Sequence, residues 1–375
     1  MTESSQVSSP GRRKRQAEQA PRDVGRHGRH DGEANNAALA PVAAQRTRSS
    51  PLRRTLPTLF VLIWLAAVVV SAGHFATDYG WWQQPEVVSR AGATAATWLG
   101  VVVLARRAGG RFVVIGLFAA VVLALVLAYP EEWALAGAAV TAACVYGVLG
   151  MLLTRPAGGL RALLELVVCV AVGVAGALVV SAYDVGLRPF RFRVLVLALV
   201  LVAAFVLAWR LGHDVGSLGR RGLVLVIGGG LLVVGSVAYT QAIQEWGSPE
   251  LVQGLVDAEA WVSTNLGAVP RPVEALLAFP ALVWGVAVRS RCRQGWWMCA
   301  LGSLGAAGIA TSLVQPRTGL GEGLTATGYD AVAGAVLGLL VVASDRLLTG
   351  AGGRRVQTSP AALARPEPAR FAPLL

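Results

Sequence analysis

The sequence predicts an all-α fold, a polytopic integral membrane helix bundle, and three observations support this class. Of its 375 residues, 55% are hydrophobic and only 14% are charged, and the mean hydropathy is +0.58. Soluble domains carry more charge than this. Apolar runs of the length that a membrane-crossing helix needs, about 20 residues, recur along the chain. The loops between them alternate between arginine-rich and acidic. A large soluble catalytic domain is excluded, because no polar stretch is longer than the N-terminal tail.

Both ends of the chain are polar. Residues 1–55 hold 11 basic and 5 acidic residues, no aromatic residue and no apolar run. Such a segment cannot bury enough surface to offset the entropy lost on ordering. We therefore expect a disordered basic cytoplasmic tail over 1–55, a transmembrane domain over 56–344, and a second disordered cytoplasmic tail over 345–375.

Ten apolar runs are candidate membrane spans. The second is diluted with alanine, threonine and glycine, and the last is short, so nine spans is the alternative. The ten runs are Leu56–Ala72, Val87–Ala105, Phe112–Tyr129, Trp133–Leu153, Ala162–Tyr183, Val194–Trp209, Leu223–Thr240, Val273–Val288, Gly295–Val314 and Tyr329–Ser344.

The positive-inside rule offers a separate test of this count, because a wrong number of spans would scramble the alternation of loop charge. With the N-terminal tail inside, the cytoplasmic loops sum to +10 and the external segments to −6. Several tryptophans also fall near the ends of runs, as in an aromatic belt. The pattern predicts about ten spans, both termini in the cytoplasm and a plasma-membrane location. The basic residues are 32 arginines and one lysine, which favours a bacterial genome of high GC content.

Patterns typical of metal, cofactor or nucleotide chemistry are absent from the sequence. The four cysteines form no CxxC pair, and no histidine has a second ligand at helical spacing, so we expect no metal site. There is no P-loop, and we expect no cofactor. The basic charge records membrane orientation, so we expect no nucleic-acid partner. No pair of carboxylates has a spacing typical of catalysis, so no catalytic residue is assigned and an enzyme is the less favoured class.

Glycines are frequent within the apolar runs, where small residues allow helices to pack closely. The run Gly228, Gly229 and Gly230 has a second interpretation, because discontinuous helices line the cavities of transporters. Pro280 in the eighth run is another candidate for such a helix break.

Glu165 is an acidic residue about one helical turn inside the fifth apolar run. It lies four residues after Arg161, which predicts an ion pair near the cytoplasmic end of the helix. The alternative is a coupling or proton-binding carboxylate of a transporter.

Three arginines break the charge pattern on the external side. Arg188, Arg191 and Arg193 alternate with two phenylalanines in a segment that the topology places outside. Guanidinium groups bind phosphate and carboxylate oxygens in pairs. The cluster could bind an anionic solute or a lipid-linked phosphate, or it could pair with acidic residues and headgroups of the outer surface.

The long external loop contains a predicted helix near residues 249–266. Ser248, Pro249 and Glu250 are typical of a helix start. Apolar residues then recur at spacings of three and four, which predicts an amphipathic helix on the outer membrane surface. A structural lid and a gate for substrate are the two interpretations.

The stretch 279–338 contains a set of residues that occurs in a known family. These are Phe279, Pro280, Gly285, Leu313, Val314, Gln315, Arg317, Asp330, Gly334 and Gly338. With them the stretch resembles the VanZ-like membrane proteins. The resemblance covers about 60 residues and departs from the family pattern at Ser312 and Gly334 and in the spacing around Arg317. It implies an envelope protein of the glycopeptide-tolerance type, with Gln315, Arg317 and Asp330 as the surviving polar positions.

These features favour a multi-pass bacterial plasma-membrane protein, such as a permease or another protein of the cell envelope that handles an anionic or lipid-linked substrate. Its expected partners are membrane lipids and that substrate. One alternative is a non-catalytic scaffold of envelope assembly that recruits a protein partner through its basic tail. Another is a membrane enzyme that acts on lipid-linked carbohydrate at the outer face through His74, Asp78 or Glu322.

Overall fold

The computed structural model describes residues 51–349 and 367–374, apart from residues 79, 81–82, 185, 187, 213–223, 292–294, 315–318 and scattered positions between 225 and 245. The described residues from 55 onward form one compact unit, to which the following description applies. The predicted N-terminal tail lies outside the described residues up to residue 50.

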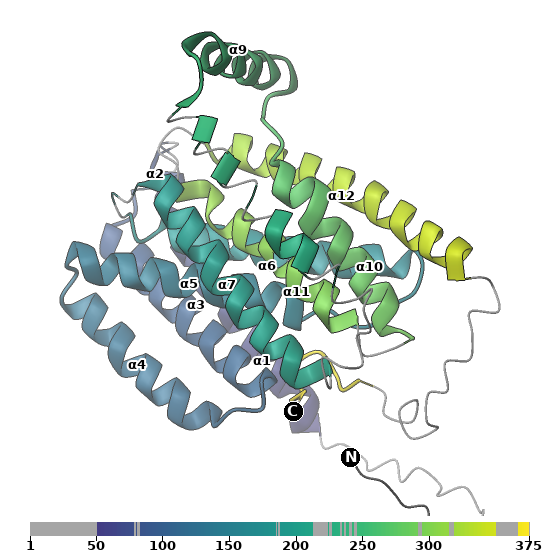
Figure 1. Ribbon diagram of the computed structural model, residues 1–375. Helices are drawn as coiled ribbons and strands as arrows, with labels where there is room; N and C mark the ends of the chain where they lie inside the picture. The colour runs from purple at the N-terminus through teal and green to yellow at the C-terminus, as the bar shows by residue number, and fades with distance from the viewer. Residues whose placement is uncertain are drawn as a thin grey trace, which may run out of the picture. The chain divides into compact units, whose positions relative to one another are not determined.

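The described part of the chain is built from helices and contains no strand (Figure 1). Two segments depart from α-helix geometry, the π-helix η3 and the short 3₁₀ helix η4. The elements are α1 (Pro51–Ser71), α2 (Gly73–Asp78), α3 (Glu86–Arg107), α4 (Phe112–Ala128), α5 (Glu132–Leu152), α6 (Arg161–Ser181), α7 (Pro189–Gly212), α9 (Pro249–Leu266), η3 (Val273–Ala278), α10 (Phe279–Arg289), α11 (Gly295–Ala310), η4 (Ser312–Val314) and α12 (Leu320–Thr349).

Six of the described helices are long and apolar enough to cross a membrane. The shorter apolar helices α4 and α11 accompany them. The last span is longer than the sequence predicted, because α12 begins at Leu320 and not near Tyr329. The seventh predicted run is only partly described. The six are Thr58–Phe75, Glu86–Arg107, Glu132–Leu152, Arg161–Ser181, Pro189–Leu211 and Leu320–Leu348.

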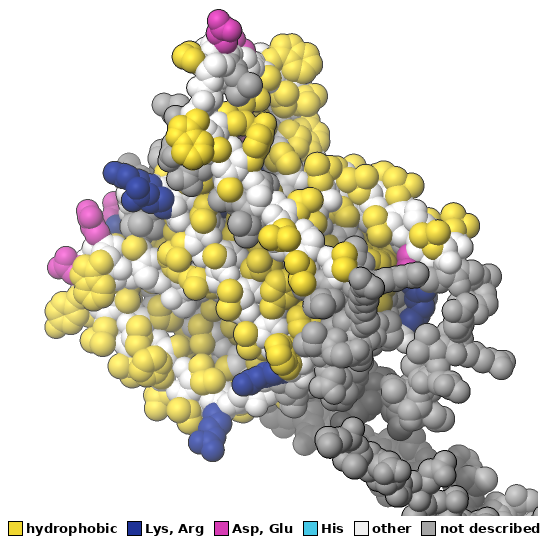
Figure 2. Space-filling view, viewed as in Figure 1, with side chains coloured by type: hydrophobic (Ala, Val, Ile, Leu, Met, Phe, Trp, Pro, Cys, Tyr) yellow, Lys and Arg dark blue, Asp and Glu magenta, His cyan; other side chains and the backbone are white. Residues whose placement is uncertain are grey.

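Large apolar side chains cover much of the outer surface of the bundle. On α4, Val113, Leu117 and Phe118 are more than half exposed. The face drawn in Figure 2 is mostly hydrophobic, and its charged side chains lie near the margins. In water such a surface would be costly, whereas lipid tails are as apolar as these side chains. The protein is therefore membrane-embedded, as the composition predicted.

The centre of the bundle is α11, whose residues are all buried. It packs against α5, α6, α7 and α10 (Figure 1). Glycines on α11 make these contacts close. A Cβ at Gly302 would lie 2.7 Å from the Cβ of Leu282, and one at Gly305 would overlap the ring of Phe279. Since no larger residue fits at these positions, the glycines set the distance between α11 and α10.

Of the two predicted helix breaks, the one at Pro280 coincides with an irregular helix. Proline donates no backbone hydrogen bond and crowds the preceding turn. The chain winds as the π-helix η3 just before it, and the N–H of Phe279 donates to the carbonyl of Glu274, five residues back. By contrast, Gly228, Gly229 and Gly230 are helical. Residues 225–226 and 233–234 on either side lie outside the described part of the chain, so the break at these glycines stays a prediction.

The helix α9 covers residues 249–266, the range that the sequence predicted, and most of its residues are exposed. The predicted disordered C-terminal tail needs correction. Residues 345–349 continue α12. Residues 367–374 lie against the bundle, where Phe371 and Leu374 pack on the hydrophobic core.

Two glycines of α12 offer a matched test of this packing. We expect Gly334→Ala to destabilise the protein by about 1–3 kcal/mol, the usual cost of overpacking, because its new Cβ would overlap the Cβ of Phe279, which cannot rotate away. Gly328→Ala meets no atom within 4 Å and should stabilise α12 slightly, since alanine favours helices. Thermal unfolding of the full chain in detergent compares the two. Equal unfolding temperatures would contradict the close contact between α10 and α12.

Candidate functional site

Two carboxylates without exposed surface lie near the start of η3. Glu274 comes from η3 itself and Asp330 from α12, and both side chains are fully buried. A buried carboxylate is costly unless it is paired and hydrogen-bonded. Each is paired with one arginine, Glu274 with Arg193 of α7 and Asp330 with Arg271, which lies just before η3. We call these four residues the paired-charge site.

Arg271 holds Asp330 with two hydrogen bonds and contacts α12 at one further residue. Its backbone N–H donates to Oδ1 at 2.7 Å, and its Nε donates to Oδ2 at 2.8 Å. Its Nη2 donates to the hydroxyl of Thr327 at 2.7 Å, one turn earlier on α12. The Asp330 carboxylate is thus satisfied on both oxygens, and the Arg271 side chain is only 13% exposed.

Arg193 and Glu274 form the more open pair. The Nη2 of Arg193 donates to Oε1 of Glu274 at 2.7 Å. The Arg193 side chain is 30% exposed, whereas that of Glu274 is 0% exposed. The second oxygen of Glu274, Oε2, is buried and has no hydrogen-bond partner among the described residues. This carboxylate is therefore only partly satisfied, which is costly in a buried setting.

Gly308 of α11 connects the two pairs. A Cβ at this position would overlap the Glu274 carboxylate, so only glycine leaves room for it. The carbonyl oxygen of Gly308 also accepts a long contact, 3.5 Å, from Nη1 of Arg271. The paired-charge site therefore draws on α7, η3, α11 and α12, with the buried α11 as its floor.

The structure places the three external arginines differently from one another. Arg188 and Arg191 are exposed at the start of α7. The side chain of Arg193 belongs to the paired-charge site, where it pairs with Glu274. Of the VanZ-like polar positions, Asp330 belongs to the site, and Gln315 and Arg317 lie outside the described residues.

Glu165 is buried, but its ion-pair partner differs from the predicted one. Arg370, from the C-terminal segment, donates to both of its carboxylate oxygens at 2.9 Å. The backbone N–H of Arg155 adds a third bond at 2.9 Å. The predicted pair with Arg161 is wrong, because Arg161 is exposed at the first residue of α6.

Arg271 and Glu274 were missed as site residues. In the sequence they contribute only to the charge of the external segments. A signal was present, because Glu274 is the second residue of the apolar run Val273–Val288, which contains a proline, and Arg271 lies three residues before Glu274. Their partners are 59 and 81 residues away, and no spacing in the sequence indicates such pairs.

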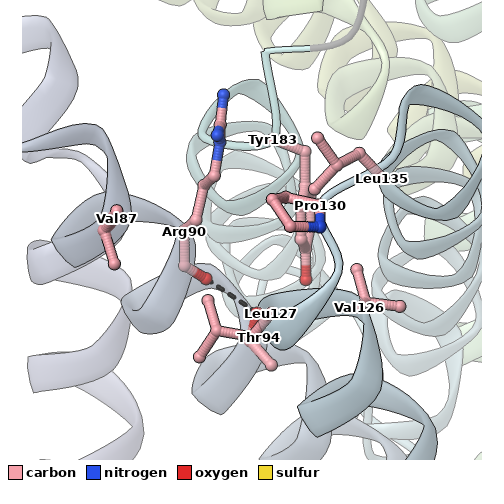
Figure 3. A pocket seen from close by; sticks show the side chains of 8 residues that line it. All are labelled: Val87, Arg90, Thr94, Val126, Leu127, Pro130, Leu135 and Tyr183. Atoms are coloured by element: carbon pink, nitrogen blue, oxygen red, sulfur yellow. Dashed lines mark hydrogen bonds between the residues drawn. The ribbon is translucent and has the colours of Figure 1, made fainter.

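A small pocket elsewhere in the bundle is lined by residues of α3, α4 and α5 with Tyr183 (Figure 3). Its polar lining comes from Arg90 and Thr94, and the Thr94 hydroxyl donates to the carbonyl of Arg90 at 2.7 Å. The volume, about 30 Å³, is enough for one or two water molecules. It is too small for a substrate.

The described residues contain no group of three or more histidine, cysteine, aspartate or glutamate side chains that could hold a metal ion. Comparisons with protein-family models, with curated proteins and with solved structures gave no match to this chain. The VanZ-like resemblance therefore stays a prediction, and the paired-charge site is interpreted from its geometry.

Removing one member of a buried pair should cost more than removing a surface pair. We expect Asp330→Ala to destabilise the protein by about 3–5 kcal/mol, because it leaves Arg271 buried without a counter-charge. The control is Glu86→Ala, which breaks the surface pair with Arg90 and should cost about 1 kcal/mol or less. Thermal unfolding in detergent measures both.

The double variant Asp330→Leu with Arg271→Leu removes both charges, and we expect it to be more stable than Asp330→Ala alone. If Asp330→Ala were no more destabilising than Glu86→Ala, the pair would contribute nothing to the bundle.

Proposed function

We propose that this chain is a multi-pass plasma-membrane protein of a bacterial cell envelope, with about ten spans and both termini in the cytoplasm. Six described helices are long enough to cross a membrane. The continuous segment made by η3 and α10, together with α4 and α11, supplies shorter candidates. The charge difference between the two sets of loops, +10 against −6, supports this orientation. In this arrangement the paired-charge site lies toward the outer face.

We further propose that the protein is a permease for an anionic or lipid-linked substrate, which binds at the paired-charge site. The observation that carries this proposal is the difference in exposure within each pair. The arginines of the site are partly exposed, and their carboxylates are fully buried. An incoming anion can therefore reach the guanidinium groups, and the carboxylates act as internal competitors for them.

Competition at the site implies a defined exchange of charge. When an anion takes Arg193, Glu274 loses its only ion-pair partner among the described residues. A carboxylate left unpaired among apolar helices favours its neutral form and takes up a proton. One anion and one proton then enter together, and the charge of the site does not change. Glu274 is a better candidate for uptake of this proton than Asp330, because its Oε2 has no hydrogen-bond partner among the described residues. Both oxygens of Asp330 accept hydrogen bonds.

The two exposed arginines at the start of α7 suit the approach of such a substrate. Arg188 and Arg191 precede Arg193 by five and two residues. Exposed positive charge raises the local concentration of an anion and speeds its encounter with a site. The external cluster of the sequence analysis is thus divided into two attracting residues and one binding residue.

Transport by the purified full chain in liposomes tests the proposal. An inward gradient of inorganic phosphate, of sulfate or of a short-chain polyprenyl phosphate is applied, and a pH-sensitive dye reports the interior. We expect at least one of these anions to enter with acidification of the interior. Arg193→Gln should reduce its uptake at least tenfold. Glu274→Gln should leave anion uptake measurable but abolish acidification, because the amide cannot carry the proton.

Arg90→Gln is the matched control for this experiment. It removes an arginine that pairs with Glu86 at the surface, so its transport should equal that of the unmodified chain. Uptake by Arg193→Gln at the unmodified rate would remove the paired-charge site from the mechanism.

A further inference from the structure

The C-terminal segment, residues 367–374, is bound at the end of the bundle opposite the paired-charge site. The backbone N–H of Leu374 donates to the carbonyl of Arg107 at 3.0 Å. The carbonyls of Ala369 and Ala372 accept from Nη1 of Arg107. Two ion pairs complete the contact, Glu367 with Arg289 and Arg370 with Glu165. In Figure 1 the C-terminus lies beside the helix ends at the lower edge of the bundle.

Arg289 is held in place by the bundle itself. Its Nη1 donates to the hydroxyl of Thr154 at 2.8 Å, and its Nη2 donates to the Thr154 carbonyl at 3.2 Å. Its guanidinium lies 3.6 Å from the centre of the Trp296 ring, a cation–π contact. The side chain is 0% exposed. The orientation of Arg289 is therefore fixed by groups other than Glu367.

The counter-charge of Arg289, in contrast, comes from the C-terminal segment. Nη2 of Arg289 contacts Oε2 of Glu367 at 2.5 Å, and Nε contacts Oε1 at 3.3 Å. Among the described residues, no carboxylate of the bundle is within ion-pair distance of Arg289. Without the segment, the bundle would present a buried, oriented guanidinium with no anion.

Arg107 contacts the same two segments of the chain as Arg289. Its Nη1 donates to the carbonyl of Ala369, two residues after Glu367, and its Nε donates to the carbonyl of Leu152, two residues before Thr154. It is 1% exposed, and the acceptors around it are the backbone carbonyls of Leu152, Ala369 and Ala372. No carboxylate is within ion-pair distance of it in the described part of the chain. Its Nη2 is buried and has no hydrogen-bond partner there. A buried guanidinium with a free donor and no counter-ion is costly.

We propose that Arg107 and Arg289 form a phosphate-binding site, the inner anion site, and that Glu367 occupies it as a built-in competitor. The carboxylate of Glu367 satisfies Arg289 but leaves Nη2 of Arg107 unpaired. A phosphate group carries up to two negative charges and at least three acceptor oxygens. It can therefore accept hydrogen bonds from both guanidiniums. The shared chemistry is a terminal phosphate, either free in solution or on a lipid headgroup.

Because Glu367 and a phosphate compete for Arg289, the bound segment 367–374 blocks the inner anion site. A ligand that binds only when residues 367–374 have left is weakened by the fraction of molecules in which they remain bound. Phosphate binding and release of the segment are then the same event. The inner anion site lies 15 residues along the helix from Glu274, roughly 20 Å away by the rise of a helix. The inference does not depend on the proposed transport at the paired-charge site.

Binding of two probes to the purified full chain tests the proposal. The probes are inorganic phosphate and dioctanoyl phosphatidic acid, with dioctanoyl phosphatidylcholine as the lipid without a terminal phosphate, and calorimetry measures affinity. The variant Glu367→Gln with Arg370→Gln keeps the segment but removes both of its charges. We expect it to bind at least one probe at least tenfold more tightly than the unmodified chain. Which probe responds identifies the source of the phosphate.

Adding Arg289→Gln to this variant should abolish that binding. Arg291→Gln is the control, because Arg291 belongs to the same end of the bundle but pairs with Asp345 and is half exposed. It should bind as tightly as its parent. In the unmodified chain, the responding probe should also speed hydrogen exchange of residues 367–374.

Equal affinity of the unmodified chain and the double variant for both probes would overturn the proposal. So would binding that survives Arg289→Gln. The double variant leaves Arg289 and Glu165 without their partners, so we expect it to fold with a lower unfolding temperature than the unmodified chain. Its thermal unfolding and its unchanged response to phosphatidylcholine check this.

Discussion

The structure depends on one constraint, which is that a charge buried among apolar helices needs a partner close by. The chain meets it with arginine–carboxylate pairs between elements that are far apart in sequence. Arg193 and Glu274 connect α7 to η3, and Arg271 ties the start of η3 to α12. At the other end, Glu165 is paired by Arg370 of the C-terminal segment. Removing one partner of a buried pair lowers the stability of the fold by more than the intact pair adds to it. The elements that carry the two partners must therefore lie together.

Close approach of the helices makes these pairs possible. The buried helix α11 carries glycines where α10 and η3 cross it, and Gly308 leaves the space that the Glu274 carboxylate fills. The π-helical winding of η3 before Pro280 sets the direction of Glu274. The geometry of the paired-charge site therefore depends on the close packing of the apolar helices. A side chain at Gly308 would displace the Glu274 carboxylate from the space it occupies.

Part of the site could be predicted from residue types. Arg193 was a candidate because an arginine on the external side contradicts the charge pattern, and Asp330 was a candidate through the VanZ-like resemblance. Arg271 and Glu274 were not candidates, because ordinary loop charges look the same in sequence. The partner of Glu165 was misplaced, since helical spacing favoured Arg161 and the true partner is 205 residues away. The C-terminal segment looked like a polar tail, because its binding rests on two charges and two apolar residues.

The sequence by itself determined that the chain is helical and membrane-embedded. Hydrophobic content and run length are local properties, and they decide whether a helix can cross a lipid bilayer. The sequence also determined where α9 begins and ends, since caps and periodicity act within a few residues. The tertiary structure alone decided which charges meet, which arginines stay exposed and where the C-terminal segment binds. These are long-range choices, set by which helices can approach closely, and no local pattern along the chain encodes them.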